Sequence, residues 1–326
     1  MYFINASSTI SHQHSFQNEE WIMRLKSLNN NSALVSPEYK NFIDGGSLRR
    51  MSEILRMGLA CSKDCIAQSG INTPDAIIVG TGLGCLTDTE KFLKNAITIK
   101  GLIPPTSFIQ STHNTIAGQI SLTLKNYNYN MTHTQNSVSF EHALIDAMLC
   151  LNEGKSTVLV GAADEKIDFM EVLAKELHFS EIENKLTSGA SFFMLSNTKN
   201  NTTKAKLVDS CAIGLNAVTN EEVIANFLKN NHLLLSDIDL VLFSTYETQQ
   251  KENVSELFHP IPTLSIEEYS GYHFTTAAFG MHLATEMLNQ KENFLIPNTT
   301  PIKKVLVYNN LGNKNIGLTL LQSIEA

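Results

Sequence analysis

The clearest pattern in the sequence is an apolar stripe that begins at Phe140. Apolar residues recur there at intervals of three and four as far as Leu151, which is the spacing of one face of an α-helix. Gly154 ends the pattern, and the segment TVLVGAA (157–163) is too continuously apolar for a strand with one face in water. The stretch from His133 to Glu165 therefore predicts a turn, an amphipathic helix and a buried strand.

The same two patterns recur along most of the chain. Periodic segments predict helices at 48–69, closed by Gly70, at about 87–96, capped by Thr87 or Asp88, and at 113–126. Apolar runs predict strands at 76–79 and 190–196. After a polar linker (197–204), strands are predicted at 205–213, 238–244, 304–308 and 316–322, with helices at about 219–230 and 274–289. We interpret the chain as two βα-rich halves of one plan, residues 1–200 and 201–326, packed as one compact unit.

Composition is that of a soluble globular protein. The chain is 43% hydrophobic and 17% charged, with a net charge of −8, which argues against a nucleic-acid or anionic-membrane surface. Arg49-Arg50 is the only adjacent arginine pair available to an acidic partner. No run approaches the roughly 20 apolar residues of a membrane span, and the amino terminus lacks a signal-peptide pattern. Five cysteines without framework spacing predict reduced thiols, so we expect a cytoplasmic protein.

The segment Gly80-Thr81-Gly82-Leu83-Gly84 places three glycines between a predicted strand and a predicted helix. Dinucleotide-binding loops occupy that position, but they have G-x-G-x-x-G spacing and an acidic residue at the end of the next strand. Neither feature is present here. We therefore favour a glycine turn required for its backbone conformation, and we expect no cofactor and no metal.

Ser137 stands just before a predicted helix N-terminus, where unpaired N–H groups and the helix dipole stabilise a thiolate or an oxyanion. A serine hydroxyl gains less from that field because it needs a general base, so Ser137 or Ser139 is interpreted as a helix cap. His273 precedes another predicted helix and is either a general base, a hydrogen-bond donor or a structural histidine.

Other residues with reactive side chains are assigned structural roles. Cys61, Cys65 and Cys150 fall on or beside helical apolar stripes and are expected to pack in the core. His12 and His14 lie in a polar amino-terminal segment and are expected to be solvated.

Six segments, in this order, resemble motifs of the β-ketoacyl-[acyl carrier protein] synthase family. They are LRRMS (48–52), VGTGLG (79–84), HNTIAGQISL (113–122), ALIDAMLCLNEGKSTVLVGAADE (143–165), GYHFTTAAFG (271–280) and NNLGNKNIGLTL (309–320). They are similar to the family's Arg-Arg-Met-Asp stretch, glycine turn, dimer-interface segment, nucleophile helix and strand, Gly-His-Thr-Leu-Gly-Ala-Ala-Gly motif and terminal Phe-Gly-Gly-x-Asn turn. The resemblance implies an α/β thiolase fold, in which two βαβαβαββ halves form a five-layer αβαβα arrangement and the protein works as a dimer.

The chain departs from this family at the catalytic positions. By resemblance, the nucleophilic cysteine falls on Ser137, the first active-site histidine on Ser244 and the lysine on Glu268, and His273 alone is retained. Decarboxylative condensation needs the thiolate to carry the acyl chain and two histidines to polarise the malonyl thioester. Loss of the nucleophile alone costs several orders of magnitude in rate, so no intact catalytic set is expected.

The sequence resembles one branch of the family in particular, the cysteine-less chain-length factors. These pair with an active ketosynthase and shape the pocket in which a polyketide or polyene grows, and the short form resembles those of bacterial aryl-polyene and flexirubin-type pigment clusters. Better-known chain-length factors carry Gln at the cysteine position, which this chain does not. The resemblance implies a heterodimer with an active ketosynthase, which receives an acyl carrier protein.

The resemblance also implies two sets of residues for this role. The tunnel gate would consist of Leu86, Thr89, Phe92, Leu93 and Phe108, although Phe92 could equally be a core residue. The dimer interface would include His113, Asn114, Ala117, Gly118 and Gln119.

Two alternatives remain open. The chain could be an active acyltransferase or condensing enzyme that uses Ser137 and His273 on acyl thioesters. It could instead be a nucleotide-binding module that acts through the Gly80–Gly84 turn, in which case a nucleotide would stabilise it against heat.

Overall fold

The computed structural model describes residues 2–178, 185–214, 219–246, 248–290, 295–296, 301–311 and 315–325. Within them, ten strands form one mixed sheet in the order β3-β2-β4-β5-β1-β6-β10-β9-β7-β8. The strands are β1 (Tyr2–Ile10), β2 (Ala76–Gly80), β3 (Tyr129–His133), β4 (Thr157–Asp164), β5 (Gly189–Ser196), β6 (Ala205–Gly214), β7 (Leu240–Ser244), β8 (Thr263–Ser265), β9 (Lys304–Asn309) and β10 (Asn315–Gln322).

The two halves of the sheet repeat one topology. From the centre outward, the first half runs β1-β5-β4-β2-β3 and the second runs β6-β10-β9-β7-β8, so each strand has a counterpart five places later in the chain. β1 joins the halves because it pairs with β5 along its length and with β6 through Tyr2–Ile4. The expected duplication of one α/β plan is confirmed.

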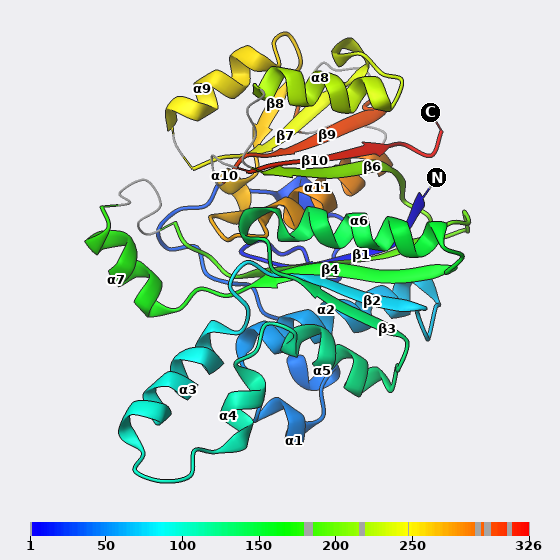
Figure 1. The fold of residues 1–326 in the computed structure, drawn as a ribbon. Coiled ribbons are helices and arrows are strands. Elements are labelled where there is room, and N and C mark those ends of the chain that lie inside the picture. The colour runs from blue at the N-terminus through cyan, green and yellow to red at the C-terminus, as the bar shows by residue number, and fades with distance from the viewer. Residues whose placement is uncertain are drawn as a thin grey trace.

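Helices complete five layers (Figure 1). The outer layers are α2 (Glu53–Ser69) with α5 (Thr115–Leu124), and α8 (Asn220–Asn230) with α9 (Thr248–Leu257). The central layer consists of α6 (Ser139–Asn152) and α11 (Thr276–Asn289), which lie between the two groups of strands. Separate apolar clusters fill the central layer and the space beneath each outer layer. The order αβαβα is therefore that expected of a thiolase fold.

Shorter helices lie outside these layers. α3 (Leu86–Thr98) and α4 (Pro105–Gln110) form a hairpin that projects from the α2/α5 side, and α7 (Asp168–Glu176) projects from the flank (Figure 1). α1 (Gly45–Leu48) precedes α2, and α10 (Glu267–Ser270) precedes α11. A 3₁₀ turn, Asn136–Val138, leads directly into α6.

Most periodic elements lie where the sequence predicts them. Gly70 closes α2 in the left-handed conformation, with φ of 69° and its N–H on the Ile66 carbonyl. The predicted caps of α3 are wrong, because Thr87 and Asp88 lie inside its first turn and Cys85 is the N-cap. The strands β1, β3 and β8 and the helices α4, α7 and α9 were not predicted.

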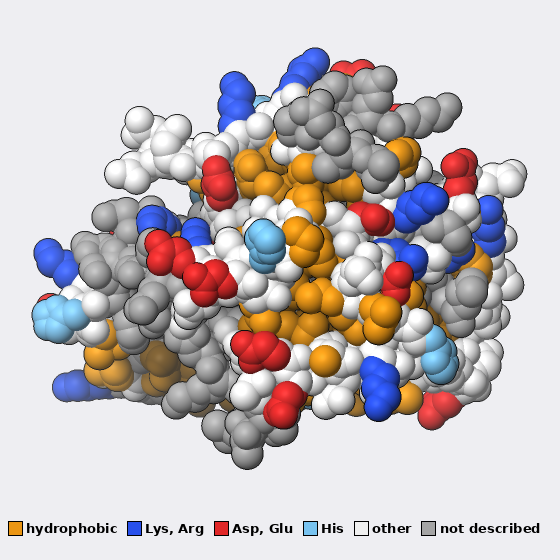
Figure 2. Space-filling model, turned by 90° about the horizontal axis from the view of Figure 1, so that it is seen from above, with side chains coloured by type: hydrophobic (Ala, Val, Ile, Leu, Met, Phe, Trp, Pro, Cys, Tyr) orange, Lys and Arg blue, Asp and Glu red, His pale blue; other side chains and the backbone are white. Residues whose placement is uncertain are grey.

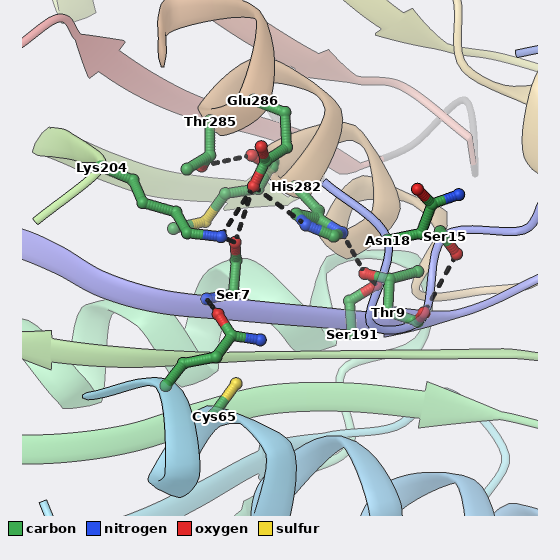
Figure 3. A network of polar contacts seen from close by, with 12 residues as sticks. Ser7, Thr9, Ser15, Asn18, Cys65, Ser191, Lys204, His282, Thr285 and Glu286 are labelled. Carbon is green, nitrogen blue, oxygen red and sulfur yellow. Dashed lines mark hydrogen bonds and ion pairs between the residues drawn. The ribbon is translucent and has the colours of Figure 1, made fainter. Parts of the chain in front are cut away.

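The buried helix α11 is joined to β1 by a polar network (Figure 3). Glu286 Oε1 accepts hydrogen bonds from Lys204 Nζ at 2.9 Å and from the Ser7 hydroxyl at 3.2 Å. His282 Nδ1 lies 2.7 Å from Thr9 Oγ1, and its Nε2 lies 3.4 Å from Glu286. Burial opposes ionisation of Glu286, but the bonds to His282 and Lys204 outweigh it and lower its pKa to about 2. The network is a charged tie across the junction of the two halves.

The surface carries no dominant charge on the face that Figure 2 shows. Acidic and basic side chains are dispersed there around a central band of apolar atoms. Within the described residues, no helix combines the length and the apolar content that a membrane crossing requires.

Candidate functional site at the start of helix α6

Ser137 lies in the 3₁₀ turn at the amino end of α6, as the sequence predicts. The preceding Asn136 has φ of 56°, a left-handed conformation that is uncommon outside glycine. Ser137 is only 1% exposed, and no described residue forms a hydrogen bond with its hydroxyl. The turn therefore presents a buried hydroxyl without a base to activate it.

The expected capping role of the two serines is wrong. The N-cap of α6 is Val138, which has no side-chain cap. The Ser139 hydroxyl donates to the Asn136 carbonyl at 2.6 Å, so it does not accept from a helix N–H. The polypeptide reaches α6 through a continuous 3₁₀ turn, and this leaves no extended residue at the position that a capping serine needs.

Ser137 and Ser244 are brought together by Asn309. Ser244 ends β7 and lies beside Asn309 of β9 in the parallel ladder. The Asn309 amide donates to the Ser137 carbonyl at 2.7 Å and to Glu141 Oε1 at 2.8 Å. Ser137 and Ser244 thus belong to one site. Asn309, which lies between them, was not predicted as a site residue.

The carboxyl group inside this site belongs to Glu267, the neighbour in the chain of Glu268, which was matched by resemblance to the family's lysine. Glu267 is 5% exposed and accepts hydrogen bonds from the Ser244 hydroxyl, from the Thr245 N–H at 2.9 Å and from the Ser265 hydroxyl at 2.9 Å. Glu268 is exposed, and its carboxylate accepts from Ser27 at 2.5 Å. Adjacent helical residues point in different directions, so Glu267 is directed into the protein and Glu268 toward the surface.

His273 is buried but is directed elsewhere. Its Nδ1 lies 3.2 Å from the Thr187 hydroxyl, and its backbone N–H donates to Thr276. Burial lowers the pKa of His273 to about 3, so the ring is neutral. Among the described residues, its hydrogen bonds do not go to Ser137 or Ser244.

The Gly80–Gly84 turn is held by a buried carboxylate. Asp164, at the end of β4, accepts from the N–H groups of Gly82 at 3.0 Å and Leu83 at 3.2 Å, and from the N–H and hydroxyl of Thr275 at 3.1 and 2.8 Å. A phosphate would need these same turn N–H groups. The Gly84 N–H is bonded to Thr81. The turn therefore ties β4 to the start of α11 and leaves no nest of free donors for a nucleotide.

The site contains three buried carboxyl groups, on Glu141, Asp164 and Glu267. Burial raises the pKa of Glu141 and of Glu267 to about 7 and also raises that of Asp164, although hydrogen bonds from neighbouring donors act in the opposite direction. No described residue forms a hydrogen bond with Oε2 of Glu141. The start of α6 and the ends of β4 and β7 therefore hold weak acids beside hydroxyl groups.

The predicted gate residues lie on the α3–α4 hairpin. Phe92 packs against Phe108 with ring centroids 5.5 Å apart, and it is half-buried rather than part of a core cluster. Leu93 is exposed, Leu86 is half-buried, and the Thr89 hydroxyl donates to the Ser111 carbonyl at 3.1 Å. The five side chains occupy one projecting element.

The predicted interface residues lie at or beside α5. His113 and Asn114 are exposed, Gly118 and Gln119 are half-buried, and Ala117 is buried. The Ala117 carbonyl accepts a hydrogen bond from the Asn130 amide of β3 at 3.0 Å. This helix therefore supports the outermost strand of the sheet.

The burial expected for the other histidines and cysteines is correct except at His12. His14 is exposed as expected, but His12 is half-buried, accompanies Thr187 and Glu267 in the lining of a cavity of about 690 Å³, and has a pKa lowered by burial. Cys61, Cys65 and Cys150 are buried, as expected, and burial raises the pKa of each thiol.

Comparison with known proteins identifies the family of the chain. The sequence model described as "Beta-ketoacyl synthase, N-terminal domain" matches residues 36–239. The chain belongs to the β-ketoacyl synthase family. A search of curated proteins finds no match.

Solved structures show the same fold for this β-ketoacyl synthase relative. "The ishigamide ketosynthase/chain length factor" is 13% identical, covers 99% of each chain and gives a TM-score of 0.81. "AntDE:AntF (apo)", described as a type II PKS acyl-carrier protein in complex with its ketosynthase, is 14% identical over 99% of each chain, with a TM-score of 0.78. The ketosynthase ApeO in complex with its chain length factor ApeC, from Xenorhabdus doucetiae, is 17% identical over 65% of this chain and 83% of that chain, with a TM-score of 0.52. At these identities the similarity establishes the thiolase-like fold.

Proposed function

We propose that this chain is a non-catalytic, chain-length-factor-like subunit that pairs with an active β-ketoacyl synthase and shapes its acyl tunnel. The observation that carries the proposal is the chemistry at the start of α6. The nucleophile position holds Ser137 without a partner for its hydroxyl, and Ser244 is hydrogen-bonded to the buried Glu267. Condensation needs a thiolate and two imidazoles, and this set of side chains supplies neither thiolate nor a second imidazole.

The distribution of exposed apolar side chains supports a partner. Among the described residues, all strongly exposed large apolar side chains except Met23 and Leu234 lie on three stretches. They are Leu93, Ile97, Ile99, Leu102, Phe108 and Ile109 on the α3–α4 hairpin; Leu122, Tyr127, Tyr129, Met131 and Leu149 around β3; and Phe169, Val172, Leu173 and Leu177 on α7 and at its C-cap. Concentrations of this kind are typical of protein–protein contacts.

The strand β3 supplies the pairing edge in this proposal. It is the first strand of the sheet and is paired with β2 on one side, while no strand among the described residues covers its other side. An open edge with exposed Tyr129 and Met131 side chains is a template for strand addition. In the proposal, the partner covers this edge and α5, which includes Gly118 and Gln119.

The alternative of a serine-dependent acyltransferase has less support. Ser137 would need a base within hydrogen-bond reach, and His273 is bonded to Thr187 instead. We expect that incubation of the wild-type chain with an acyl thioester adds no acyl mass to it. A stable mass increase that Ser137→Ala abolishes would instead favour the enzyme over the non-catalytic subunit.

Copurification tests the proposal directly. The chain would be co-expressed with an intact Cys-His-His ketosynthase encoded in the same genome, and the complex measured by size-exclusion chromatography with light scattering. We expect a 1:1 complex that converts malonyl groups on an acyl carrier protein into polyketide or polyene chains. A chain that stays monomeric beside a folded ketosynthase would contradict the proposal.

The Phe92–Phe108 pair is proposed as the floor of the shared tunnel. Phe92→Ala should lengthen the products of the reconstituted complex by removing a ring that limits tunnel depth. The measurement is the product mass distribution, with Lys94→Ala on the exposed side of the same helix as a control. The same distribution in wild type, Phe92→Ala and Lys94→Ala would remove this assignment.

A further inference from the structure

The helix α3 is attached to the protein in an unusual way. Asp88 is its only buried residue, whereas Leu93 and Ile97 are 53% and 85% exposed. Its Phe92 packs against Phe108 of α4, which belongs to the same hairpin. Helices are usually held by an apolar face buried against the core, so the position of α3 must depend on other contacts.

A carboxyl group from the central sheet supplies the first of these contacts. Glu165 directly follows β4 and is 4% exposed. Its Oε1 accepts the Thr87 backbone N–H at 2.9 Å, and its Oε2 accepts the Thr87 hydroxyl at 2.8 Å. The first N–H groups of a helix have no carbonyl partner within the helix, so Glu165 satisfies one of them from outside and also meets the positive end of the helix dipole.

The other polar ties of the hairpin lie at the same end. The Ser52 hydroxyl donates to Asp88 at 2.6 Å, and the Gln110 amide donates to the Arg50 carbonyl at 2.8 Å. Figure 1 shows the hairpin extending away from these points. At its tip Leu102 is 99% exposed. Within the described part of the chain, the hairpin is therefore an arm held at its base, whose angle is set by a few directional hydrogen bonds.

We propose that Glu165 is a positioning residue that sets the angle of the α3–α4 hairpin (residues 86–110) and, through it, the chain length of the product. The effect on the product rests on the proposed function, because it requires Phe92 and Phe108 to face the tunnel of a paired ketosynthase. The effect on the hairpin is a property of this chain alone. Because β4 lies within the sheet, its end holds Glu165 in a fixed position. A small rotation of the hairpin about this end would displace the rings of Phe92 and Phe108, which lie further along the hairpin.

Hydrogen exchange of the isolated subunit tests the effect on the hairpin. Thr87→Val removes the hydroxyl donor with little change in shape, and Thr87→Ser keeps it. Amides in residues 86–110 should exchange about fivefold faster in Thr87→Val, the effect of one lost hydrogen bond, and at the wild-type rate in Thr87→Ser. Peptides from α2 and β4 should be unchanged in both. Equal exchange of the hairpin in all three proteins would overturn the proposal.

The product distribution of the reconstituted complex tests the effect on chain length. Thr87→Val and Glu165→Gln should broaden the range of product lengths at nearly constant total turnover, whereas Thr87→Ser should match the wild type. A fall in turnover with an unchanged length distribution would show that Glu165 only stabilises the fold, and would overturn the positioning role. Failure of the wild-type subunit to form any complex would refute the proposed function instead, and the exchange experiment would still decide whether Glu165 holds the hairpin.

Discussion

At the scale of single residues, the central site is built from buried acids whose hydrogen-bond donors are neutral groups. Asn309 is the donor to Glu141, and hydroxyl and backbone N–H groups are the donors to Glu267 and Asp164. Neutral donors offset only part of the cost of removing a carboxylate from water. This explains why the pKa of Glu141 and of Glu267 rises to about 7.

Glu141→Gln should therefore stabilise the protein at alkaline pH. The folded-state pKa of Glu141 is raised from 4.5 to about 7, so the favourable contribution of the protonated group is complete below about pH 4.5 and is lost as the pH rises through 7. Glutamine keeps an acceptor for Asn309 and cannot ionise. We expect its free energy of unfolding at pH 8 to exceed the wild-type value by up to about 3 kcal/mol, with the gain disappearing near pH 4.5, as measured by urea denaturation. A difference that does not change with pH would refute the assignment.

Gly80 is a position where a single methyl group should disrupt the site. A Cβ there would lie 2.6 Å from the Ser139 carbonyl oxygen, which is backbone and cannot move aside. Gly80→Ala should cost about 2–4 kcal/mol in thermal or urea unfolding. Gly118→Ala is the matched control, because a Cβ at that helical glycine meets nothing within 4 Å. The control should stabilise the isolated subunit by up to about 1 kcal/mol, and equal losses at both positions would contradict this view of the turn.

At the scale of elements, the contact between β1 and α11 shows how a polar strand can occupy the centre of a sheet. β1 carries Asn5, Ser7 and Thr9, all at most 2% exposed. Asn5 donates to Ser196 at 2.7 Å and Thr9 to Ser191 at 2.8 Å, both on β5. Ser7 reaches Glu286 on α11. Because each of these three side chains has a partner, their burial carries little penalty.

Lys204→Met should break this tie and destabilise the fold. It leaves Glu286 buried without its cation, at a cost of about 3 kcal/mol at pH 7. The folded-state pKa of Glu286 is lowered to about 2, so its contribution is present above about 4.5 and is lost as the pH falls toward 2. The difference between variant and wild type should thus shrink in acid. Urea denaturation at pH 7 and pH 4 measures it, and Lys199→Met in the exposed linker serves as a control that should show no loss at either pH.

At the scale of the whole molecule, the two halves of the sheet end differently. β3, at the first end, is flanked by exposed large apolar side chains, whereas no residue of β8, at the second end, is among the exposed large apolar residues of the described chain. The α3–α4 hairpin and α7 add further apolar surface. A molecule with this asymmetry fits a subunit with one preferred side for a partner.

Met131→Lys should weaken the proposed complex without affecting the subunit. Met131 is 40% exposed on β3, so the lysine is tolerated in the monomer to within about 0.5 kcal/mol, but a covered edge would bury its charge. We expect the dissociation constant from the ketosynthase to rise about tenfold or more. Leu234→Lys, at a 71% exposed residue outside the three apolar stretches, should leave it unchanged. Equal binding by both variants would place the interface elsewhere.

Sequence patterns predicted the elements whose apolar spacing follows from their own burial. Six elements were predicted in this way: the helices α2, α6 and α11 and the strands β2, β4 and β5. Each helix has apolar residues at helical spacing on its buried face, and each strand contains a continuous apolar run. β1 and β3 escaped because polar residues interrupt their apolar ones, which leaves no continuous apolar run. In β1 the polar side chains of Asn5 and Ser7 bond to distant residues, and β3 is exposed at an edge of the sheet. Ser137, Ser244 and His273 were selected by resemblance to the family and not by apolar spacing.

The sequence by itself thus determined the duplicated α/β plan and the turn that leads into α6, since both follow from local spacing; that Ser137 in this turn stands at the nucleophile position is what the resemblance to the family implies. Only the tertiary structure decided which of two adjacent glutamates enters the site, that Asn309 joins Ser137 to Ser244, and that Glu165 holds the base of α3. Those contacts join residues far apart in the chain, and their geometry depends on side-chain directions that the packed layers impose.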